Sequence, residues 1–423
     1  MLRRYVLLMI VFCLASCSRQ SPELDVDVRR ASNLDIEHGR YLAAIGSCAS
    51  CHTARDGPAL GGGVAFPVAG AYFENPIGSV YSSNISPDST TGIGSWTLGE
   101  FARAMRHGVS RDGRHLFPVF PYTHFVALSD RDISALFVFL KRADPVRYTP
   151  PEADLPFPLN IRVLLTAWKF VFARGAPYDY DKRKSESWNR GAYITLGIGH
   201  CGACHSPRNI FLAERSDARF GGGFIVDEVE PGKFRRWSAV NLTSAKAGLQ
   251  AWSNRDIENY LRTGHSSRAG SLGPMNKVIA GATQYLTSED AAAIAEFLKS
   301  LAALQEEEQP PLSISARNAG LNEYREHCAE CHKESGRGGF MKAPPLVGSA
   351  IVQSADPTSL INVILYGAHV DSRLSAPFGA WESMKGFQRK LDDAQVASLA
   401  TYIRSDWGHQ ASSVEPDVVR QQR

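Results

Sequence analysis

The chain has 423 residues, of which 44% are hydrophobic and 21% are charged, and its formal net charge is +3 at pH 7. This composition is typical of a globular protein, and so small a net charge excludes the strongly basic surface on which nucleic-acid binding depends. A chain of this length is too long for one hydrophobic core, so we expect about two to four domains and no nucleic-acid partner.

The N-terminus predicts export from the cytoplasm. Two arginines near Met1 precede an apolar run from Tyr5 to Leu14, and small residues then lead to Cys17. This order is typical of a secretory signal that is too short to span a membrane. The letters LASC that end at Cys17 also resemble a bacterial lipobox, in which the cysteine becomes the lipid-modified first residue. We therefore predict a signal peptide over residues 1–17 and a lipid anchor at Cys17 on the periplasmic side of the cell membrane. Cleavage of an ordinary signal near Cys17 is the alternative.

Three copies of C-x-x-C-H follow along the chain, at Cys48–His52, Cys201–His205 and Cys328–His332. This spacing lets two thiols form thioethers to a haem while the adjacent histidine binds its iron. The alternative is a redox dithiol or half of a zinc site, but structural zinc needs four protein ligands and no second cysteine pair lies near any copy. We predict three covalently bound haems c as cofactors. The attachment residues are Cys48, Cys51, Cys201, Cys204, Cys328 and Cys331, and the iron ligands are His52, His205 and His332.

Each motif stands between two predicted helices. A short helical pattern precedes it, and a better-marked helix begins much later with a capping residue at Ser129, Thr287 or Asp392. Apolar residues at i, i+3, i+4 and i+7 then give each later helix one core-facing stripe. Helix, haem motif, loop and helix is the arrangement of a class I-like cytochrome c domain. We predict a mainly α fold of three such domains in tandem, at residues 18–144, 186–303 and 312–408.

The segments outside these domains have different characters. Residues 145–185 form a linker rich in proline and aromatic residues, and it contains the apolar stretch Leu159–Phe172. That stretch either packs between haem domains or docks on a membrane or partner surface. Residues 304–311 are a charged, proline-terminated linker, and residues 409–423 are a tail without a readable pattern.

Methionine is the usual second axial ligand of a high-potential carrier haem. Met275 lies between the helix-ending Gly264 and the next helix start, and Met384 occupies the corresponding interval of the third domain. We predict that both bind iron, whereas gap filling in a core is the alternative. Met341 stands too soon after the third motif to be favoured.

The first domain departs from this pattern. The interval after Gly108 contains no methionine, and Phe120 occupies the slot where one is expected. We predict His124 as the sixth ligand, which gives a bis-histidine haem of lower potential. Ligation by His115, or an iron that is open or bound otherwise, are the alternatives.

Five stretches resemble the tri-haem cytochrome c subunits of bacterial membrane-bound dehydrogenases, which serve alcohol, gluconate and aldehyde oxidation. The resemblance runs from Glu37 to Trp407. Many members of this family have Pro-x-Met-Pro-Tyr at the place of residues 118–122, whereas this chain has Phe120 instead of the methionine. The methionine that is missing from the first domain is therefore also a difference from the family. The matching stretches are Ser83–Asp88, Thr91–Trp96, Arg111–Tyr122, Gly199–Asn209 and Thr401–Gly408.

The resemblance implies a catalytic dehydrogenase subunit as partner, carrying pyrroloquinoline quinone, flavin or molybdenum, and ubiquinone or a terminal oxidase as electron acceptor. The chain would transfer electrons through its haems with no catalytic residue of its own, as one subunit of an oxidoreductase complex. One alternative is a multi-haem peroxidase-like enzyme that uses an open first haem. Another is a stand-alone lipoprotein electron shuttle.

Overall fold

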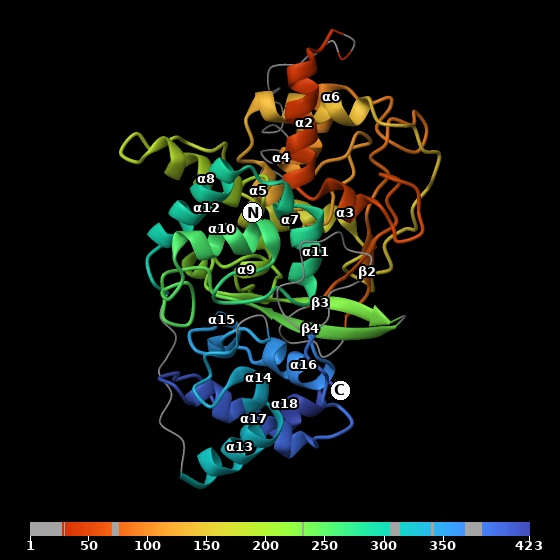
Figure 1. The fold of residues 1–423 in the computed structure, drawn as a ribbon. Coiled ribbons are helices and arrows are strands. Elements are labelled where there is room, and N and C mark those ends of the chain that lie inside the picture. The colour runs from red at the N-terminus through yellow and green to blue at the C-terminus, as the bar shows by residue number, and fades with distance from the viewer. Residues whose placement is uncertain are drawn as a thin grey trace, which may run out of the picture.

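The structure is a computed structural model, and it describes residues 28, 30–69, 76–230, 232–304, 314–339, 342–368 and 383–423. The predicted signal peptide, Cys17, most of the 304–311 linker and Met341 lie outside these residues. The fold is 43% helix and 9% strand, which confirms the mainly α prediction. Figure 1 shows three helical groups, which we call the first, second and third units, in order along the chain.

The first unit surrounds the first C-x-x-C-H motif. Its helix α6 begins after the predicted cap Ser129, whose side chain accepts a hydrogen bond from the Asp132 amide. Helices α2 and α4 begin with complete capping boxes at Ser32 and Thr97, so their starts are fixed locally. The elements are α2 (Asn33–Ile45), α3 (Cys48–His52), β1 (Ala65–Pro67), β2 (Ser79–Tyr81), α4 (Leu98–His107), α5 (Tyr122–Phe125) and α6 (Asp130–Lys141).

The second unit repeats this order, and its strand pair is longer than the β1–β2 pair of the first unit. Strands β3 and β4 pair antiparallel with Gly223 opposite Ala239, and a bulge lies between Glu228 and Glu230. The predicted cap Thr287 starts the last helix. The elements, with the segment that leads into them, are η1 (Arg162–Leu164), α7 (Leu165–Phe172), α8 (Glu186–Leu196), α9 (Gly202–His205), η2 (Ser216–Ala218), β3 (Gly223–Glu230), β4 (Lys233–Ala239), α10 (Asn254–Thr263), α11 (Pro274–Gly281), η3 (Thr283–Tyr285) and α12 (Ser288–Ser300).

The third unit contains the last motif and the C-terminal tail. The predicted cap Asp392 starts α17 with a complete capping box. The tail has structure that its sequence did not predict: α18 packs against α17, and both Val414, which precedes α18, and Val419 within it are buried in the core of this unit. The elements are α13 (Ile314–His327), α14 (Ala329–His332), α15 (Ala350–Gln353), α16 (Thr358–Tyr366), α17 (Asp393–Ser405) and α18 (Pro416–Arg420).

In every unit the first helix crosses the last helix at a glycine. A Cβ atom on these glycines would lie 2.1, 1.9 and 2.3 Å from a backbone oxygen of the facing helix, so a side chain there would separate the two helices. The repeated device supports three tandem units of one kind. The pairs are Gly39 with Ala135, Gly191 with Ala293, and Gly320 with Ser398.

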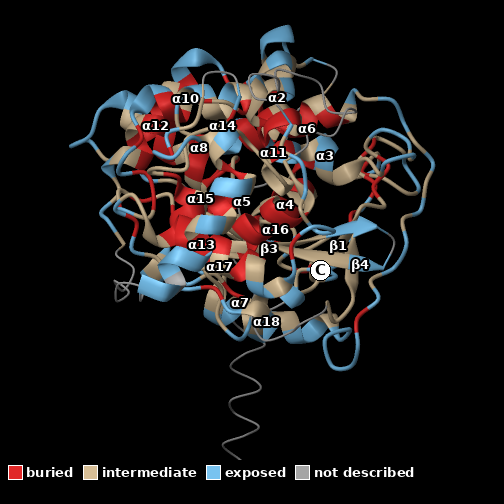
Figure 2. Ribbon diagram, turned by 60° about the horizontal axis from the view of Figure 1, so that its bottom comes forward, coloured by how far each residue is buried: buried red, intermediate tan, exposed pale blue. Residues whose placement is uncertain are grey.

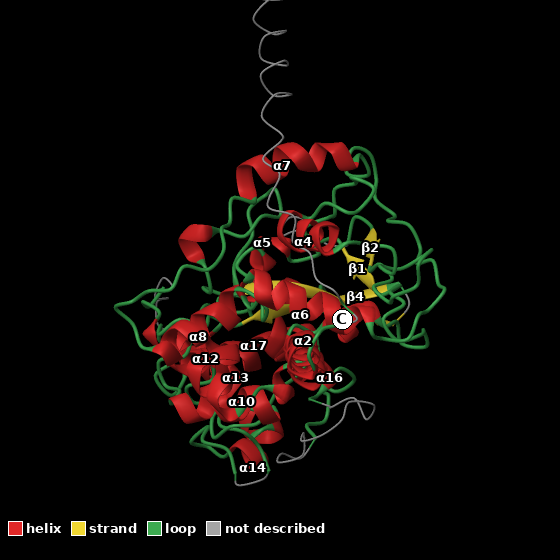
Figure 3. Ribbon diagram, turned by 90° about the horizontal axis from the view of Figure 1, so that it is seen from above, coloured by secondary structure: helices red, strands yellow, loops and turns green. Residues whose placement is uncertain are grey.

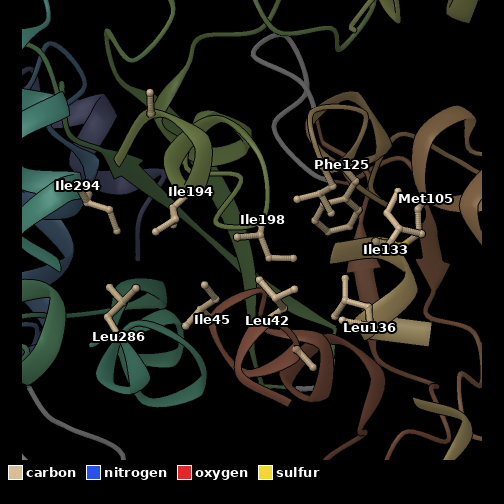
Figure 4. Close-up of a cluster of buried hydrophobic side chains, with 14 of the residues drawn as sticks. Leu42, Ile45, Met105, Phe125, Ile133, Leu136, Ile194, Ile198, Leu286 and Ile294 are labelled. Atoms are coloured by element: carbon tan, nitrogen blue, oxygen red, sulfur yellow. The ribbon is translucent and has the colours of Figure 1, made fainter. Parts of the chain in front are cut away.

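The first two units share one hydrophobic core, whereas the third has its own. Figure 4 shows Leu42 and Ile45 of α2 beside Ile194 and Ile198 of the second unit. Figure 2 shows that buried residues gather on the packed helices of the units. The first two units therefore stabilise each other by burying apolar surface that each alone would expose.

The third unit docks on the outside of the β3–β4 hairpin (Figure 1). The contact is polar: Asn362 donates to the Arg236 carbonyl at 2.7 Å, Ser359 donates to the Ser238 carbonyl at 2.9 Å, and Arg236 pairs with Asp356 at 2.9 Å. The hairpin thus connects the shared core of the first two units to the third unit.

Candidate haem sites

The three motif histidines have the same local geometry. In each, Nδ1 is hydrogen-bonded to a backbone carbonyl further along its unit: His52 to Ser83 at 2.7 Å, His205 to Val240 at 2.7 Å and His332 to Pro344 at 3.0 Å. A carbonyl can only accept, so each Nδ1 carries the proton and the lone pair stands on Nε2. Metal-binding histidines are oriented in this way.

Burial lowers the pKa of His52, His205 and His332 from the ordinary histidine value, although the carbonyl bonds oppose the shift. The rings are therefore neutral at neutral pH. A neutral imidazole is the form that binds iron, because a protonated ring has no free lone pair.

The motif cysteines are free thiols, of which Cys328 is buried and the other five are half-buried. Burial raises the pKa of Cys48, Cys201 and Cys328 to about 12, and the neighbouring thiol of each motif adds to the shift. Burial also raises the pKa of Cys51 and Cys204 to about 11. A reactive dithiol needs a lowered pKa, so these sites do not fit redox chemistry of the thiols themselves.

The zinc alternative gains no support from the fold. Within the described ranges, no group of three or more His, Cys, Asp or Glu side chains is placed to hold a bare metal ion. Paired thiols beside an oriented neutral histidine instead suit a haem, in which the thiols bind the porphyrin edge and the histidine binds the iron.

Buried donors in the second unit provide an independent test of fit. Trp237 Nε1, Trp252 Nε1 and Arg268 Nε are buried and have no hydrogen-bond partner among the residues that the structure describes. Buried N–H groups without partners are rare in folded proteins and call for a missing acceptor. The two carboxylates of a haem are acceptors of this kind, so these residues fit the group.

The structure places Met275 in the second unit and Met384 in the third, and both residues are partly exposed. Met275 lies half-buried at the start of α11, where Gly273 packs against Trp237 of the hairpin. The carbonyl that holds His205 belongs to Val240, directly after the same hairpin. Met384 is half-buried and pairs with Ala368 beyond the end of α16. Both remain predicted ligands.

In the first unit, both predicted histidines have their ring nitrogens engaged. His124 is buried on α5, with Nδ1 3.0 Å from the Leu196 carbonyl and Nε2 2.7 Å from Glu214. To bind iron it would have to exchange one of these partners. His115 contacts Thr166 through Nε2 and Lys169 through Nδ1, each at 3.0 Å. The structure therefore leaves no ring nitrogen of His124 or His115 free to bind iron.

Two other side chains of the first unit are accounted for by packing. Phe120 packs edge-on against Phe125 with ring centroids 5.4 Å apart. Met105 is buried within α4 as part of the shared core. Packing therefore explains the position of both residues.

Comparison with known proteins identifies the group to which these sites belong. The chain is 35% identical to the fructose dehydrogenase cytochrome subunit of Gluconobacter japonicus, across 98% of this chain and 87% of that protein. It is 33% identical to the gluconate 2-dehydrogenase cytochrome c subunit of Pantoea cypripedii, across 91% of this chain and 88% of that protein. The chain belongs to the cytochrome c subunits of bacterial dehydrogenases.

Two further matches agree with this assignment. Residues 315–403 match the family model described as cytochrome C oxidase, cbb3-type, subunit III. The chain is also 34% identical to the cytochrome c subunit of the quinone-type alcohol dehydrogenase of Gluconobacter oxydans, across 89% of this chain and 79% of that protein. The resemblance predicted from the motifs is confirmed, and the cytochrome c domain indicates covalently bound haem c.

The cytochrome c subunit holds its first two motifs close together. A Cβ atom on Gly46, just before the first motif, would lie 2.7 Å from Ile198 Cδ1, just before the second. Gly281 of α11 approaches Ser50 inside the first motif. The charge of Cys51 contributes to raising the pKa of Cys204, after burial and together with Glu214. The haems bound there would therefore be neighbours.

Two reciprocal sets of contacts, in which a tyrosine of each unit bonds to an aspartate of the other, join these two units. The sequence analysis did not predict them. Tyr41 of α2 donates to Asp290 of α12 at 2.5 Å, and Arg190 of α8 donates two bonds of 2.7 Å to the same carboxylate. In the mirror arrangement, Tyr193 of α8 donates to Asp132 of α6. His38 of α2 contacts that carboxylate at 2.7 Å.

The exchange follows from the repeat. Each tyrosine stands two positions after the crossing glycine of its unit, and each aspartate stands three positions after the helix cap of the other unit. These matching positions in the two repeats are the feature of the sequence from which the contacts could have been predicted. The contacts make the two units a pseudo-symmetric pair, comparable to a two-fold dimer interface.

Proposed function

We propose that this cytochrome c subunit carries three haems c and passes electrons from a catalytic dehydrogenase subunit to ubiquinone or a terminal oxidase at the periplasmic face of the membrane. The observation that carries the proposal is the threefold repetition of one site, a pair of thiols beside a histidine held through Nδ1. The relatives named as dehydrogenase cytochrome subunits support the catalytic partner.

Within this proposal the residues have defined tasks. His52, His205 and His332 would bind the three haem irons, and Met275 and Met384 would be the second protein ligands in the second and third units. His124 is the proposed sixth ligand in the first unit, which requires its Nε2 to leave Glu214. When bound, each haem supplies reversible one-electron chemistry at its iron. Lipid at Cys17 is the proposed anchor.

The test is purification of the native complex from membranes. We expect a large catalytic chain with a flavin, pyrroloquinoline quinone or molybdenum group to co-purify. Adding that chain's substrate without oxygen should reduce the haems, and a soluble ubiquinone analogue should reoxidise them. If no large chain accompanies the protein, or if the purified protein turns over peroxide by itself, the subunit assignment is wrong and the shuttle or peroxidase alternative gains.

A further inference from the structure

Exposed apolar side chains lie on the segment before η1, on η1 and α7, and on the loop before η2. We call these together the α7 surface, and Figure 3 shows α7 at the edge of the molecule, beyond α4 and α5. Its side chains are among the most exposed large apolar groups of the described chain, with exposed fractions from 51% to 79%. The surface is made by Phe157, Val163, Leu164, Phe170, Val171 and Phe211.

The inner side of α7 is firmly attached. Lys169 Nζ donates to the His107 and Gly108 carbonyls at 2.8 and 2.6 Å, and thereby caps the end of α4. Trp168 Nε1 donates to the Phe211 carbonyl at 2.8 Å, and the rings of Phe172 and Phe211 lie 5.7 Å apart. These bonds fix which side of α7 points outward, so its exposed apolar residues cannot turn inward without breaking them.

A helix that is apolar on both sides is normally covered on both sides. Here the inner side packs on the protein, whereas Phe170 and Val171 on the outer side are 73% and 55% exposed. Contiguous exposed apolar patches of this kind mark sites of interaction with proteins or membranes. The outer side of α7 is therefore a candidate for contact with a second surface.

The charges around the surface identify the covering partner. Between Asp154 and Asp179 the chain has no acidic residue but carries Arg162, Lys169 and Arg174. The Arg174 guanidinium lies 4.9 Å over the Phe170 ring, at the edge of the surface. Arg162 also interacts with the charges of Asp112 and Glu152, and Lys169 points inward, so Arg174 is the cation at the outer edge of the surface. An apolar face with a cation at its edge and no acidic residue in its own segment is typical of segments that lie in the headgroup layer of anionic membranes. No described helix is long and apolar enough to cross a membrane.

We propose that the α7 surface rests in the headgroup layer of a bilayer that contains anionic lipid. The contact needs no modified cysteine, so it is separate from the proposed anchor at Cys17. Because Lys169 ties α7 to the end of α4, the contact sets the first unit against the membrane. That this unit delivers electrons to a lipid-soluble acceptor is a consequence that rests on the proposed function.

Vesicle flotation of the full haem-containing chain tests the proposal, with Cys17→Ser in every sample to remove the lipid anchor. We expect the protein to float with vesicles of phosphatidylcholine and phosphatidylglycerol, and less with phosphatidylcholine alone. Phe170→Asp with Val171→Asp should weaken binding at least about tenfold, because two apolar side chains lose their burial. Arg174→Glu should weaken binding to the anionic vesicles only.

The matched control places the same charges on equally exposed apolar residues elsewhere. Leu34 and Ile314 are each 81% exposed and lie outside the α7 surface. Leu34→Asp with Ile314→Asp should leave flotation unchanged. Equal flotation of the Phe170/Val171 variant and this control overturns the proposal, as does loss of the dehydrogenase chain from the Phe170/Val171 variant with vesicle binding intact.

Haem content and reduction by the co-purified dehydrogenase, measured on the same samples, separate the two proposals. Loss of vesicle binding by the Phe170/Val171 variant with haem and reduction intact supports the membrane contact. Absence of haem, or of reduction, in the unaltered chain contradicts the proposed function, whatever the vesicles show.

Discussion

Our prediction for the first haem depends on Phe120 and on two histidines close to it in the sequence. Phe120 stands where a methionine is expected, and its ring packs on Phe125. His124 and His115 both use their ring nitrogens for other contacts. Methionine ligation raises a haem potential relative to histidine ligation, so histidine ligation in the first unit would give its haem the lower potential.

We expect His124→Ala to convert one haem to the high-spin form while the others stay low-spin, because that iron loses its sixth ligand. Absorption and electron paramagnetic resonance spectra measure the change, and His115→Ala is the control. Phe120→Met should instead add a sulfur-to-iron band and raise the lowest haem potential. An unchanged spectrum for His124→Ala would show that His124 does not bind iron and only contacts Leu196 and Glu214.

Met275 offers a ligand test with a control inside the same chain. We expect Met275→Leu to remove one sulfur-to-iron band and to lower one haem potential, because leucine has no donor atom. Met105 is a buried core methionine on α4, so Met105→Leu should change neither quantity. Redox titration with near-infrared spectroscopy compares the two, and equal effects would show that Met275 only fills space.

At the scale of elements, helices α2, α6, α8 and α12 form one assembly through the exchanged tyrosines. Each tyrosine bond ends on a carboxylate, and such bonds contribute about 1.5–3 kcal/mol. We expect Tyr41→Phe and Tyr193→Phe each to lower the free energy of unfolding by about 1.5–3 kcal/mol in urea titrations. Tyr285→Phe is the control because Tyr285 is 52% exposed. Equal effects of the three variants would show that the bonds of Tyr41 and Tyr193 do not stabilise the assembly.

The same assembly predicts a pH dependence. Burial alone would raise the pKa of Asp290, but bonds from Arg190 and Tyr41 outweigh it and hold the pKa below the usual range. Its contribution to stability is therefore complete above about pH 4, the value for an unfolded aspartate, and is lost as the pH falls through the lowered pKa. Thermal unfolding between neutral and acid pH measures this loss. Asp290→Asn should be less stable at neutral pH and should lose less stability on acidification.

At the scale of the whole molecule, local signals in the sequence predicted much and long-range contacts little. The caps at Ser129, Thr287 and Asp392 start the helices that they predicted, because capping is decided within one turn. For Leu159–Phe172 the sequence allowed two interpretations, packing between haem domains or docking on another surface. An apolar run by itself does not indicate which surface covers it.

The features that the sequence did not reveal all depend on contacts between distant segments. The shared core of the first two units joins Leu42 to Ile198, and the tail adds Val419 to the core of the third unit. Periodicity describes which side of a helix is apolar but not which partner it meets. The exchange of Tyr41 and Tyr193 was visible only as matching positions in two repeats.

The number of covalently bound haems tests the central claim most directly. Three thiol pairs beside oriented histidines predict that the denatured full-length protein, freed of non-covalent groups by acid and organic solvent, carries the mass of three haems. Replacing Cys204 with alanine should remove one haem and destabilise the second unit. A mass that shows fewer than three haems, with the matching motif cysteines still free thiols, would contradict the account.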